Sequence, residues 1–262
     1  MSLYFAIGSL PRLEFDAKPD TTTAAVIELF EMNLPESALK QLKVLRRWID
    51  LRNLSRMIGQ HEYFDYRGNE SRSTLKEHLD NEVELPQYFF DFLSKFDTVD
   101  MQKKNFAYLI ARYFHYERKK AKGLLKEFLQ FENEWRIILA SYMAKKSGRN
   151  LGDVLKFEDM SDPTVQMAIV QKDSPGQFVF PFEFSKLEVV LKEAGSNPTK
   201  QMQALAKYRF DFYAEMEYDF PFTIRRAFAY LMQLMQLEEL YALDELEGRQ
   251  ELMKLMESEH AS

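Results

Sequence analysis

The sequence predicts an all-α protein built from helical bundles, and three features of the chain lead to this fold class. Apolar residues recur at intervals of three and four, as Leu39, Leu42 and Leu45 do, and this is the period of one buried helix face. Prolines stand at the start of several such segments. The two-residue alternation that marks a half-buried strand is nearly absent.

Proline and capping residues predict where helices begin. Four prolines each open an apolar-periodic segment: Pro35, Pro86, Pro163 and Pro198. A proline in the first turn of a helix removes an N–H group that has no partner within the helix. Asp162 and Asn197 precede two of these prolines and are good N-caps. Thr74 and Glu77 have the spacing of a capping box before a short helix.

The periodic segments divide the chain into short-linked helices. In chain order, we expect helices over residues 21–32, 35–59, 72–80, 86–96, 101–120, 123–147, 151–157, 162–172, 183–194, 198–218 and 221–258. Only "LYFAI" near the start and "QFVFPF" at 177–182 could be extended, and Pro181 interrupts the second. We therefore expect residues 1–262 to form a single all-helical domain, organised as one body or as two or three bundle lobes.

The last expected helix changes character along its length. Its first half is apolar on nearly every side and contains Ile224, Phe228 and Leu231, whereas its second half is rich in acid. Charged residues such as Arg225 and Arg226 keep its uncharged runs well below the roughly 20 residues that cross a membrane. We expect a central core helix that continues as an exposed acidic helix and does not span a bilayer.

Cysteine is absent, which excludes disulfides, a thiolate nucleophile and Cys-ligated metal centres. This composition is typical of a cytoplasmic protein. The first residues, "MSLYFAIGSLPRL", have no basic region, and Gly8 and Pro11 interrupt their apolar run. We therefore expect no secretory signal.

No motif for metal or cofactor binding emerges from the chain. The four histidines, His61, His78, His115 and His260, occur in four separate segments, and no pair has the spacing of a metal-binding helix. No Gly-rich turn is followed by Lys-Ser or Lys-Thr, and no nucleophile elbow is present. The sequence predicts no metal and no cofactor.

A group of carboxylates is the strongest candidate for catalysis. The segment "RFDFYAEMEYDF" contains Asp211, Glu215, Glu217 and Asp219, and paired carboxylates can perform general acid and base chemistry. Asp211 and Glu215 share a helix face at a spacing of four, where like charges usually remain in water. A solvated acidic face beside a buried aromatic face is the favoured interpretation, and an enzyme that uses these carboxylates is the alternative.

The formal net charge is -6, but it is distributed unevenly. Basic residues predominate between residues 102 and 123: Lys103, Lys104, Arg112, Arg118, Lys119, Lys120 and Lys122. Acidic residues predominate from residue 238 to 259, and Glu238, Glu239 and Glu245 are the candidates there for contact with a basic partner. We expect both groups to face solvent, either as plain solvated faces or as partner-binding surfaces.

The basic segment fits an acidic protein surface or anionic headgroups better than nucleic acid. Its aromatic residues keep the spacing of a buried helix face, as Phe106, Ile110 and Tyr113 do. The negative net charge also opposes a nucleic-acid partner.

Two stretches resemble one family of ATPase proteins. The stretch "FPFTIRRAFAYLMQLMQLEELYALDELEGRQELMKLM" is similar to the C-terminal repeat of the family that comprises the C-type subunit of A-type ATPases and the d-type subunit of V-type ATPases. The matching residues are Phe222, Ala229, Tyr230, Leu231, Leu237, Glu238, Glu239 and Leu240. The run "DLRNLSRMI", with Asp50, Asn53 and Leu54, resembles the recurring Asp-x-x-Asn-Leu motif of that family.

A closer resemblance is to an uncharacterised bacterial family that is encoded beside V/A-type ATPase genes in chlamydiae, spirochaetes and Bacteroidetes. The similarity begins at "LYFAIGSLPRL" and includes the "RGN" turn at 67–69. It continues through the segments 85–96, 131–148 and 230–248, and so extends over nearly the whole chain.

The resemblance implies a function without catalysis. The C-type and d-type subunits are helical sockets that seat the central stalk of the ATPase on its membrane ring. By this likeness the chain is expected to be a non-catalytic coupling subunit of a bacterial V/A-type ATPase, with the stalk and ring subunits as partners. It would lie on the cytoplasmic side, peripheral to the inner membrane and in contact with it only through those partners. A generic helical adaptor is a further alternative.

Overall fold

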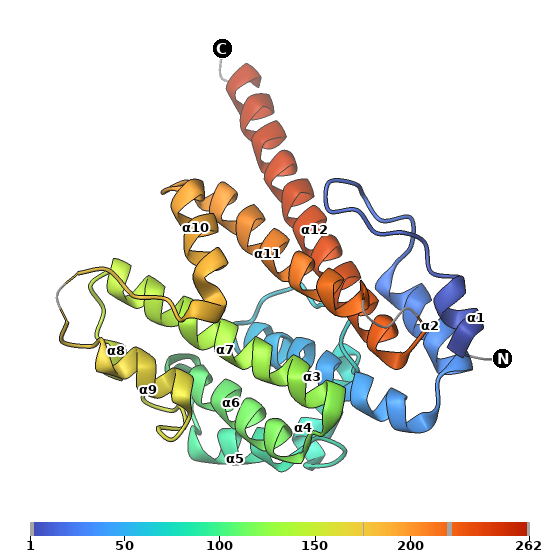
Figure 1. The fold of residues 1–262 in the computed structure, drawn as a ribbon, viewed down its shortest axis with the longest axis horizontal. Helices are drawn as coiled ribbons and strands as arrows, with labels where there is room; N and C mark the ends of the chain where they lie inside the picture. The colour runs from blue at the N-terminus through green and yellow to red at the C-terminus, as the bar shows by residue number, and fades with distance from the viewer. Residues whose placement is uncertain (1–2, 175, 219–221, 261–262) are drawn as a thin grey trace. The chain divides into compact units, whose positions relative to one another are not determined.

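The computed structural model describes residues 3–174, 176–218 and 222–260, and for residues 217–218 and 243–260 it describes the backbone only (Figure 1). Throughout these ranges the chain forms helices and no strand, which confirms the predicted all-α class. The chain divides into two compact units. Unit 1 consists of Met1–Leu39 with Pro181–Ser262, and unit 2, Lys40–Phe180, is inserted between these two parts.

Unit 1 joins the N-terminal segment to the C-terminal helices. Its elements are α1 (Leu3–Gly8), α2 (Thr23–Asn33), the 3₁₀ helix η1 (Phe182–Phe184), α10 (Ser185–Ala194), α11 (Pro198–Tyr218) and α12 (Ile224–His260). α12 packs along α11 and also contacts α1 and α2, while α10 packs on α11 (Figure 1). The residues 227–237 of α12 are all buried. This confirms the expected core helix, whereas the side chains of residues 243–260, which make up most of its acidic half, lie outside the described residues.

Unit 2 is a second set of packed helices. Its elements are α3 (Glu36–Ile58), which begins in unit 1, and then α4 (Arg72–Asn81), α5 (Gln87–Lys95), α6 (Val99–Lys120), α7 (Gly123–Lys146), α8 (Leu151–Val154) and α9 (Pro163–Val170). α6 packs against α5 and α7, and α8 and α9 pack against α7. The side of α6 that faces this core contributes Leu109, Tyr113 and Phe114.

The predicted helix starts are mostly confirmed. Each of the four prolines stands directly before or at the first residue of a helix, and Asp162 caps α9 by accepting a hydrogen bond from the Thr164 N–H at 2.9 Å. The capping box at Thr74 is wrong. The N-cap of α4 is Ser71, whose side chain accepts the Thr74 N–H at 3.1 Å, so that Thr74 lies in the first turn.

The two runs that could have been extended are not strands. "LYFAI" forms α1, in which the neighbouring residues Ala6 and Ile7 are both buried. A strand would direct neighbouring side chains to opposite faces, whereas the helix lets both pack in the core. In the second run, the side-chain amide of Gln171 donates to the Val179 carbonyl at 3.0 Å and accepts from the Val179 N–H at 2.7 Å. The backbone of Val179 is therefore satisfied without a partner strand.

A buried carboxylate joins three helices of unit 2. Glu117 of α6 is 6% exposed, and its Oε1 accepts hydrogen bonds from Arg47 of α3 at 2.7 Å and from the Tyr88 hydroxyl of α5 at 2.9 Å. The Tyr113 hydroxyl donates to the Val44 carbonyl at 3.0 Å. Burial raises the pKa of both tyrosines, and the charge of Glu117 raises it further. The phenols are therefore hydrogen-bond donors at neutral pH.

Asp50 and Asn53 of α3 hold the segment that follows this helix. The buried Asp50 carboxylate accepts the backbone N–H groups of Asn69 at 2.8 Å and Glu70 at 3.2 Å, and the Asn69 side-chain amide at 2.7 Å. The Asn53 amide bonds both backbone groups of Asp65, at 2.8 and 2.9 Å. We call these contacts the α3 brace. It joins the "DLRN" run and the "RGN" turn, two separate features of the sequence, into one structural feature.

The two carboxylates of the α3 brace region, Asp50 and Asp65, have pKa values that are shifted in opposite directions. Burial is the largest influence on Asp50 and raises its pKa, although hydrogen bonds from Asn69 and Glu70 oppose the change. Burial acts in the same direction on Asp65, but there the hydrogen bonds and charge of Arg67, at 2.7 and 2.8 Å, outweigh it with help from Arg56. The pKa of Asp65 is therefore lowered.

Gly68→Ala is expected to destabilise unit 2 because a Cβ atom there would lie 2.3 Å from Oδ1 of Asp50. Overpacking of this kind costs about 1–3 kcal/mol. Trp48 and Trp135 both lie in unit 2, so urea unfolding followed by tryptophan fluorescence measures the loss there. Gly8→Ala is the control, since a Cβ atom at Gly8 would meet nothing within 4 Å. Equal unfolding midpoints for the Gly68 variant and the wild type would contradict the α3 brace.

The pH dependence of stability should change in opposite directions in Asp65→Asn and Asp50→Asn. Because the pKa of Asp65 is lowered from 3.8 in the folded chain, its contribution is present above pH 3.8 and is lost as pH falls through the folded value. Because the pKa of Asp50 is raised from 3.8, its contribution is full below pH 3.8 and is lost as pH rises through the folded value.

The measurement is the difference in unfolding free energy between the wild type and each variant from pH 7 to pH 3. As pH falls, the unfolding free energy of the wild type should decrease relative to that of Asp65→Asn. Relative to that of Asp50→Asn, it should increase. Parallel trends in the two variants would show that one of these carboxylates has the opposite shift.

Candidate functional site

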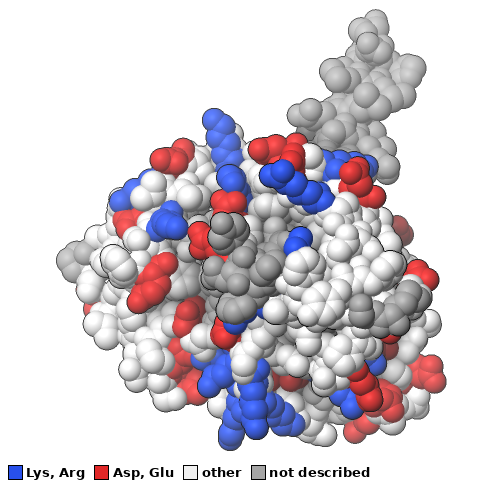
Figure 2. All heavy atoms as spheres, turned by 45° about the vertical axis from the view of Figure 1, so that its right-hand side comes forward, with Lys and Arg blue, Asp and Glu red and all other residues white. Residues whose placement is uncertain are grey.

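The basic segment forms part of the surface of unit 2, as expected for all but one of its residues. The exposed side chains are Lys103, Lys104, Arg112, Lys119, Lys120 and Lys122, whereas Arg118 is partly buried. Lys120 lies over the ring of Tyr116, 3.8 Å from its centroid. Lys and Arg side chains occur in small groups on the face drawn in Figure 2, with Asp and Glu side chains among them. Neither charge covers that face.

Three exposed cations form what we call the basic edge: Arg112 and Lys119 of α6 and Lys126 of α7. Arg112 and Lys119 are seven residues apart and share a side of α6, because seven steps of ~100° come to nearly two turns. Lys119 and Lys126 both line a hollow of about 370 Å³ between α6, α7 and α9. No ion pair within the described residues engages any of these three cations. Sequence reasoning missed Lys126 because it lies beyond the densest part of the basic run.

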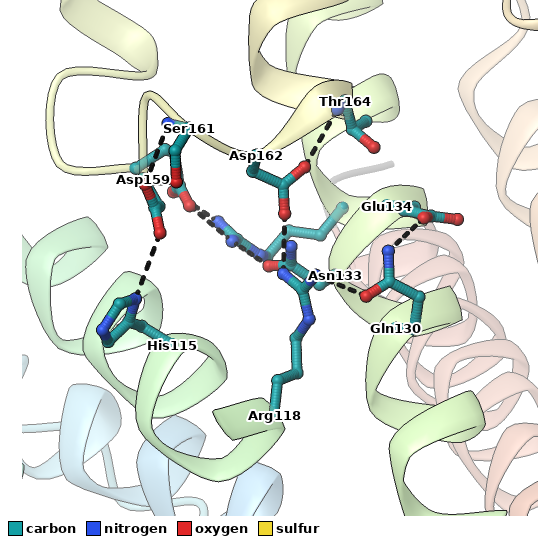
Figure 3. Close-up of polar contacts among 11 residues, drawn as sticks. His115, Arg118, Gln130, Asn133, Glu134, Asp159, Ser161, Asp162 and Thr164 are labelled. Carbon is teal, nitrogen blue, oxygen red and sulfur yellow. Dashed lines mark hydrogen bonds and ion pairs between the residues drawn. The ribbon is translucent and has the colours of Figure 1, made fainter. Parts of the chain in front are cut away.

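Arg118 lines this hollow and is partly buried by its contacts there. Its Nη1 donates to Oδ2 of Asp162 at 2.8 Å, and its Nη2 donates to Gln130 of α7 (Figure 3). Its side chain is 22% exposed and that of Asp162 is 5% exposed. The expectation that Arg118 faces solvent with its neighbours is therefore wrong, because Asp162 at the start of α9 binds it.

Two more acids in the segment between α8 and α9 are bound by basic side chains of the helices beneath. Arg136 of α7 contacts both oxygens of Glu158 at 2.7 Å. His115 of α6 lies 3.4 Å from Asp159, and Ser161 donates its hydroxyl to Asp159 at 2.6 Å (Figure 3). We call these two pairs, together with Arg118–Asp162, the loop clamp. The bonds from Ser161 are the main cause of a lowered pKa of Asp159, and His115 adds to it.

The loop clamp and the adjacent Ser161 bring together a serine, an aspartate and a histidine, but in the wrong arrangement for nucleophilic catalysis. A catalytic serine donates its proton to the histidine, which the aspartate orients. Here Ser161 and His115 both contact Asp159, and the serine hydroxyl donates to the carboxylate. This geometry holds the segment in place and does not activate Ser161.

The acidic candidates do not form one partner surface among the described side chains. Glu238 accepts the Thr23 N–H at 2.7 Å and the Thr23 hydroxyl at 2.6 Å. It thereby satisfies a free N–H group at the N-terminus of α2. Glu239 is partly buried, and the side chain of Glu245 lies outside the described residues. In the structure, Glu238 therefore joins α12 to the N-terminus of α2 within unit 1.

The carboxylates of the alternative enzyme hypothesis are engaged by lysines on the surface of unit 1. Asp211 contacts Lys207 at 2.9 and 3.0 Å, and Glu215 lies 3.6 Å from Lys186. The Glu217 side chain and Asp219 lie outside the described residues. Over the described part of the chain, no group of three His, Asp or Glu side chains could hold a metal ion. No helix in that part is both long and apolar enough to cross a membrane.

Arg118→Glu and Lys119→Glu make the same change of charge at neighbouring positions, so comparing them tests the loop clamp. The first places a carboxylate against the buried Asp162 and should lower the unfolding free energy by about 2 kcal/mol or more. The second should leave it within about 0.5 kcal/mol, since Lys119 is exposed and has no ion-pair partner among the described residues. Urea unfolding followed by tryptophan fluorescence measures both. Similar losses in the two variants would contradict the role given to Arg118.

Comparison with known proteins finds relatives in chlamydiae. The chain is 28% identical over 240 residues to an uncharacterized protein of Chlamydia muridarum, with 88% of this chain and 90% of the relative covered. It is 28% identical over 222 residues to an uncharacterized protein of Chlamydia trachomatis serovar D, covering 82% and 83% of the two chains. No solved structure matches the chain significantly. A family model described as "Protein of unknown function (DUF2764)" matches residues 1–260, and the chain therefore belongs to that family.

Proposed function

We propose that this chain is a non-catalytic coupling subunit of a bacterial V/A-type ATPase that connects the central stalk to the membrane ring. The proposal starts from the resemblance of its sequence to the C-type and d-type ATPase subunits and to the family encoded beside V/A-type ATPase genes. The single structural observation that carries it is the basic edge, a set of exposed cations without ion-pair partners among the described residues. Such a surface is suited to contact with an acidic partner.

The positions of the resembling residues support the proposal at the level of the fold. Asp50 and Asn53, which carry the Asp-x-x-Asn-Leu likeness, and the "RGN" turn at 67–69 meet in the α3 brace. Residues that hold a helix to the following segment are what related helical subunits would share. The likeness therefore concerns how the chain folds.

The other two hypotheses have less support. An enzyme would need Asp211 and Glu215 available for proton transfer, but each carboxylate pairs with a lysine on an exposed surface. A generic helical adaptor would have the same fold and surfaces, and it differs from the proposed coupling role only in its partners. The genes that flank those of the chlamydial relatives distinguish the adaptor from the ATPase component.

The basic edge would act mainly on the rate of encounter. Complementary charges speed association, and salt removes the advantage because the Debye length falls from ~10 Å at 0.1 M to ~3 Å at 1 M. In the proposed complex, the basic edge faces an acidic surface of the stalk or the ring. The chain would then lie at the cytoplasmic face of the inner membrane and contact it through its partners.

The combined variant Arg112→Glu/Lys119→Glu/Lys126→Glu should associate with the stalk or ring complex at least about tenfold more slowly than the wild type at low salt. The two rates should converge near 1 M salt. The measurement is binding to the immobilised chain at several salt concentrations, with circular dichroism as the control for folding.

A second combined variant, Lys43→Glu/Lys76→Glu/Lys172→Glu, makes the same change of net charge at exposed lysines elsewhere on unit 2 and should bind nearly as fast as the wild type. If both variants slow binding equally, net charge and not the basic edge controls the encounter. If the wild type binds neither the stalk nor the ring subunits, the ATPase assignment fails.

A further inference from the structure

A second hollow, on unit 1, is an open groove of about 910 Å³. α10 and α11 form its walls, and Phe15 and Phe182 also line it. The residues that line it on α11 begin at Lys200 and end at Glu215. The groove is therefore larger than the hollow beside the basic edge, and it follows most of the length of one helix.

The shape of the groove fits a helix. Its wall on α11 includes Ala204, Tyr208 and Phe212, which recur every four residues along one side of that helix. From Lys200 to Glu215 the wall extends for about 22 Å, because each helical residue rises ~1.5 Å. This is about four turns. Peptide helices that bind in grooves contact them through side chains at this same spacing.

Aromatic side chains that could anchor such a helix are already exposed. Phe182 is 88% exposed, and Phe15, Tyr208 and Phe212 are partly exposed along the groove. Clustered exposed apolar side chains often mark a protein interaction site. An apolar helix face laid over these rings would remove them from water.

The charges around the groove indicate which helix would fit. The side formed by η1 and α10 carries Glu183 and Glu193, and neither has an ion pair within the described residues. The charges on α11 differ, since Asp211 and Glu215 pair with Lys207 and Lys186. Lys200, at the start of the α11 wall, is a cation without an ion pair within the described residues, so the unpaired negative charge is confined to the α10 side. The α10 side of the groove therefore has negative charge that an occupant could neutralise. A basic flank on the occupant would complement it.

We propose that this groove binds an amphipathic helix of a partner protein, with apolar side chains on Ala204, Tyr208 and Phe212 and with basic side chains toward Glu183 and Glu193. A small ligand would use only part of a groove about four turns long. An anionic membrane surface would be repelled by these two carboxylates. The proposal does not depend on the ATPase assignment, because the groove lies on unit 1 and the basic edge on unit 2.

A designed helical peptide tests the groove directly in the full-length chain. The probe is a fluorescent peptide of about 16 residues, enough for four turns, with leucines along one face and lysines on one flank. One control peptide has the same composition in scrambled order, and another has glutamate in place of the lysines. We expect saturable binding of the probe by fluorescence anisotropy and at least about tenfold weaker binding of each control peptide. No binding of the probe, or equal binding of the scrambled peptide, would overturn the proposal.

Variants locate the binding within the chain. Ala204→Trp should block the groove and weaken probe binding about tenfold, and Phe182→Ser should weaken it severalfold. Val189→Ser is the matched control, since Val189 lies on α10, is 54% exposed and does not line the groove. Binding that survives Ala204→Trp and Phe182→Ser places the peptide elsewhere and rejects the proposal.

Two further outcomes would assign the groove to a different occupant and would also reject the proposal. The first is binding of the apolar dye N-phenyl-1-naphthylamine in the groove without displacement by the peptide, which indicates a small ligand. The second is a dimer in sedimentation velocity that Phe182→Ser dissociates, which indicates a second copy of this chain. Because the assay contains no ATPase component, its result and that of the stalk and ring binding experiment are independent.

Discussion

The requirement that buried carboxylates find donors is the constraint on which unit 2 depends. An unpaired ion inside a protein costs several kcal/mol, so each such group must receive hydrogen bonds or charge from its neighbours. Asp50 is bonded by N–H groups of the segment after α3, Glu117 by Arg47 and Tyr88, and Asp162 by Arg118. These donors come from other elements than their carboxylates. The donors therefore fix the helices and connecting segments as well as neutralising the acids.

Most of the fold could be predicted because the signals for helices are local. Prolines and caps mark where a helix begins, and the apolar period shows how far it continues, so the predicted and observed bounds of most helices agree to within a few residues. α1 was missed because six residues are too few to display a helical period. Thr74 was mistaken for a cap because Ser71, with the same chemistry, begins the helix three residues earlier.

The candidate sites were harder to predict because they depend on contacts between distant parts of the chain. Arg118 and Lys119 are neighbouring basic residues that the sequence does not distinguish. Arg118 is bound by Asp162, 44 residues away, and by Gln130, whereas Lys119 remains on the surface. Glu238 was grouped with the acidic residues that follow it, yet it bonds Thr23, 215 residues away. The groove of unit 1 requires α10 and α11 to be packed together, and no local pattern contains that information.

The two surfaces also differ in the forces that would act on a partner. The basic edge presents hydrated cations whose effect extends over a Debye length and declines with salt. The groove presents aromatic rings, whose attraction acts at contact and is not screened by salt as the attraction between charges is. A partner of the first surface would be selected by the sign of its charge, and a partner of the second by the shape of its apolar face together with basic side chains toward Glu183 and Glu193. The two proposed contacts would thus be of different physical kinds.

The insertion of unit 2 into unit 1 has a consequence for synthesis on the ribosome. Domains generally fold as units during synthesis, N-terminal parts first. All residues of unit 2 have been synthesised once Phe180 has left the ribosome. α1 and α2 cannot pack fully until α12 has been synthesised, because Glu238 of α12 bonds Thr23 at the N-terminus of α2, 215 residues earlier in the chain. The apolar side chains of α2, such as Val26 and Phe30, therefore remain uncovered while the inserted unit folds. During this interval α2 of the nascent chain is a hydrophobic segment that chaperones could bind, although the folded protein buries it.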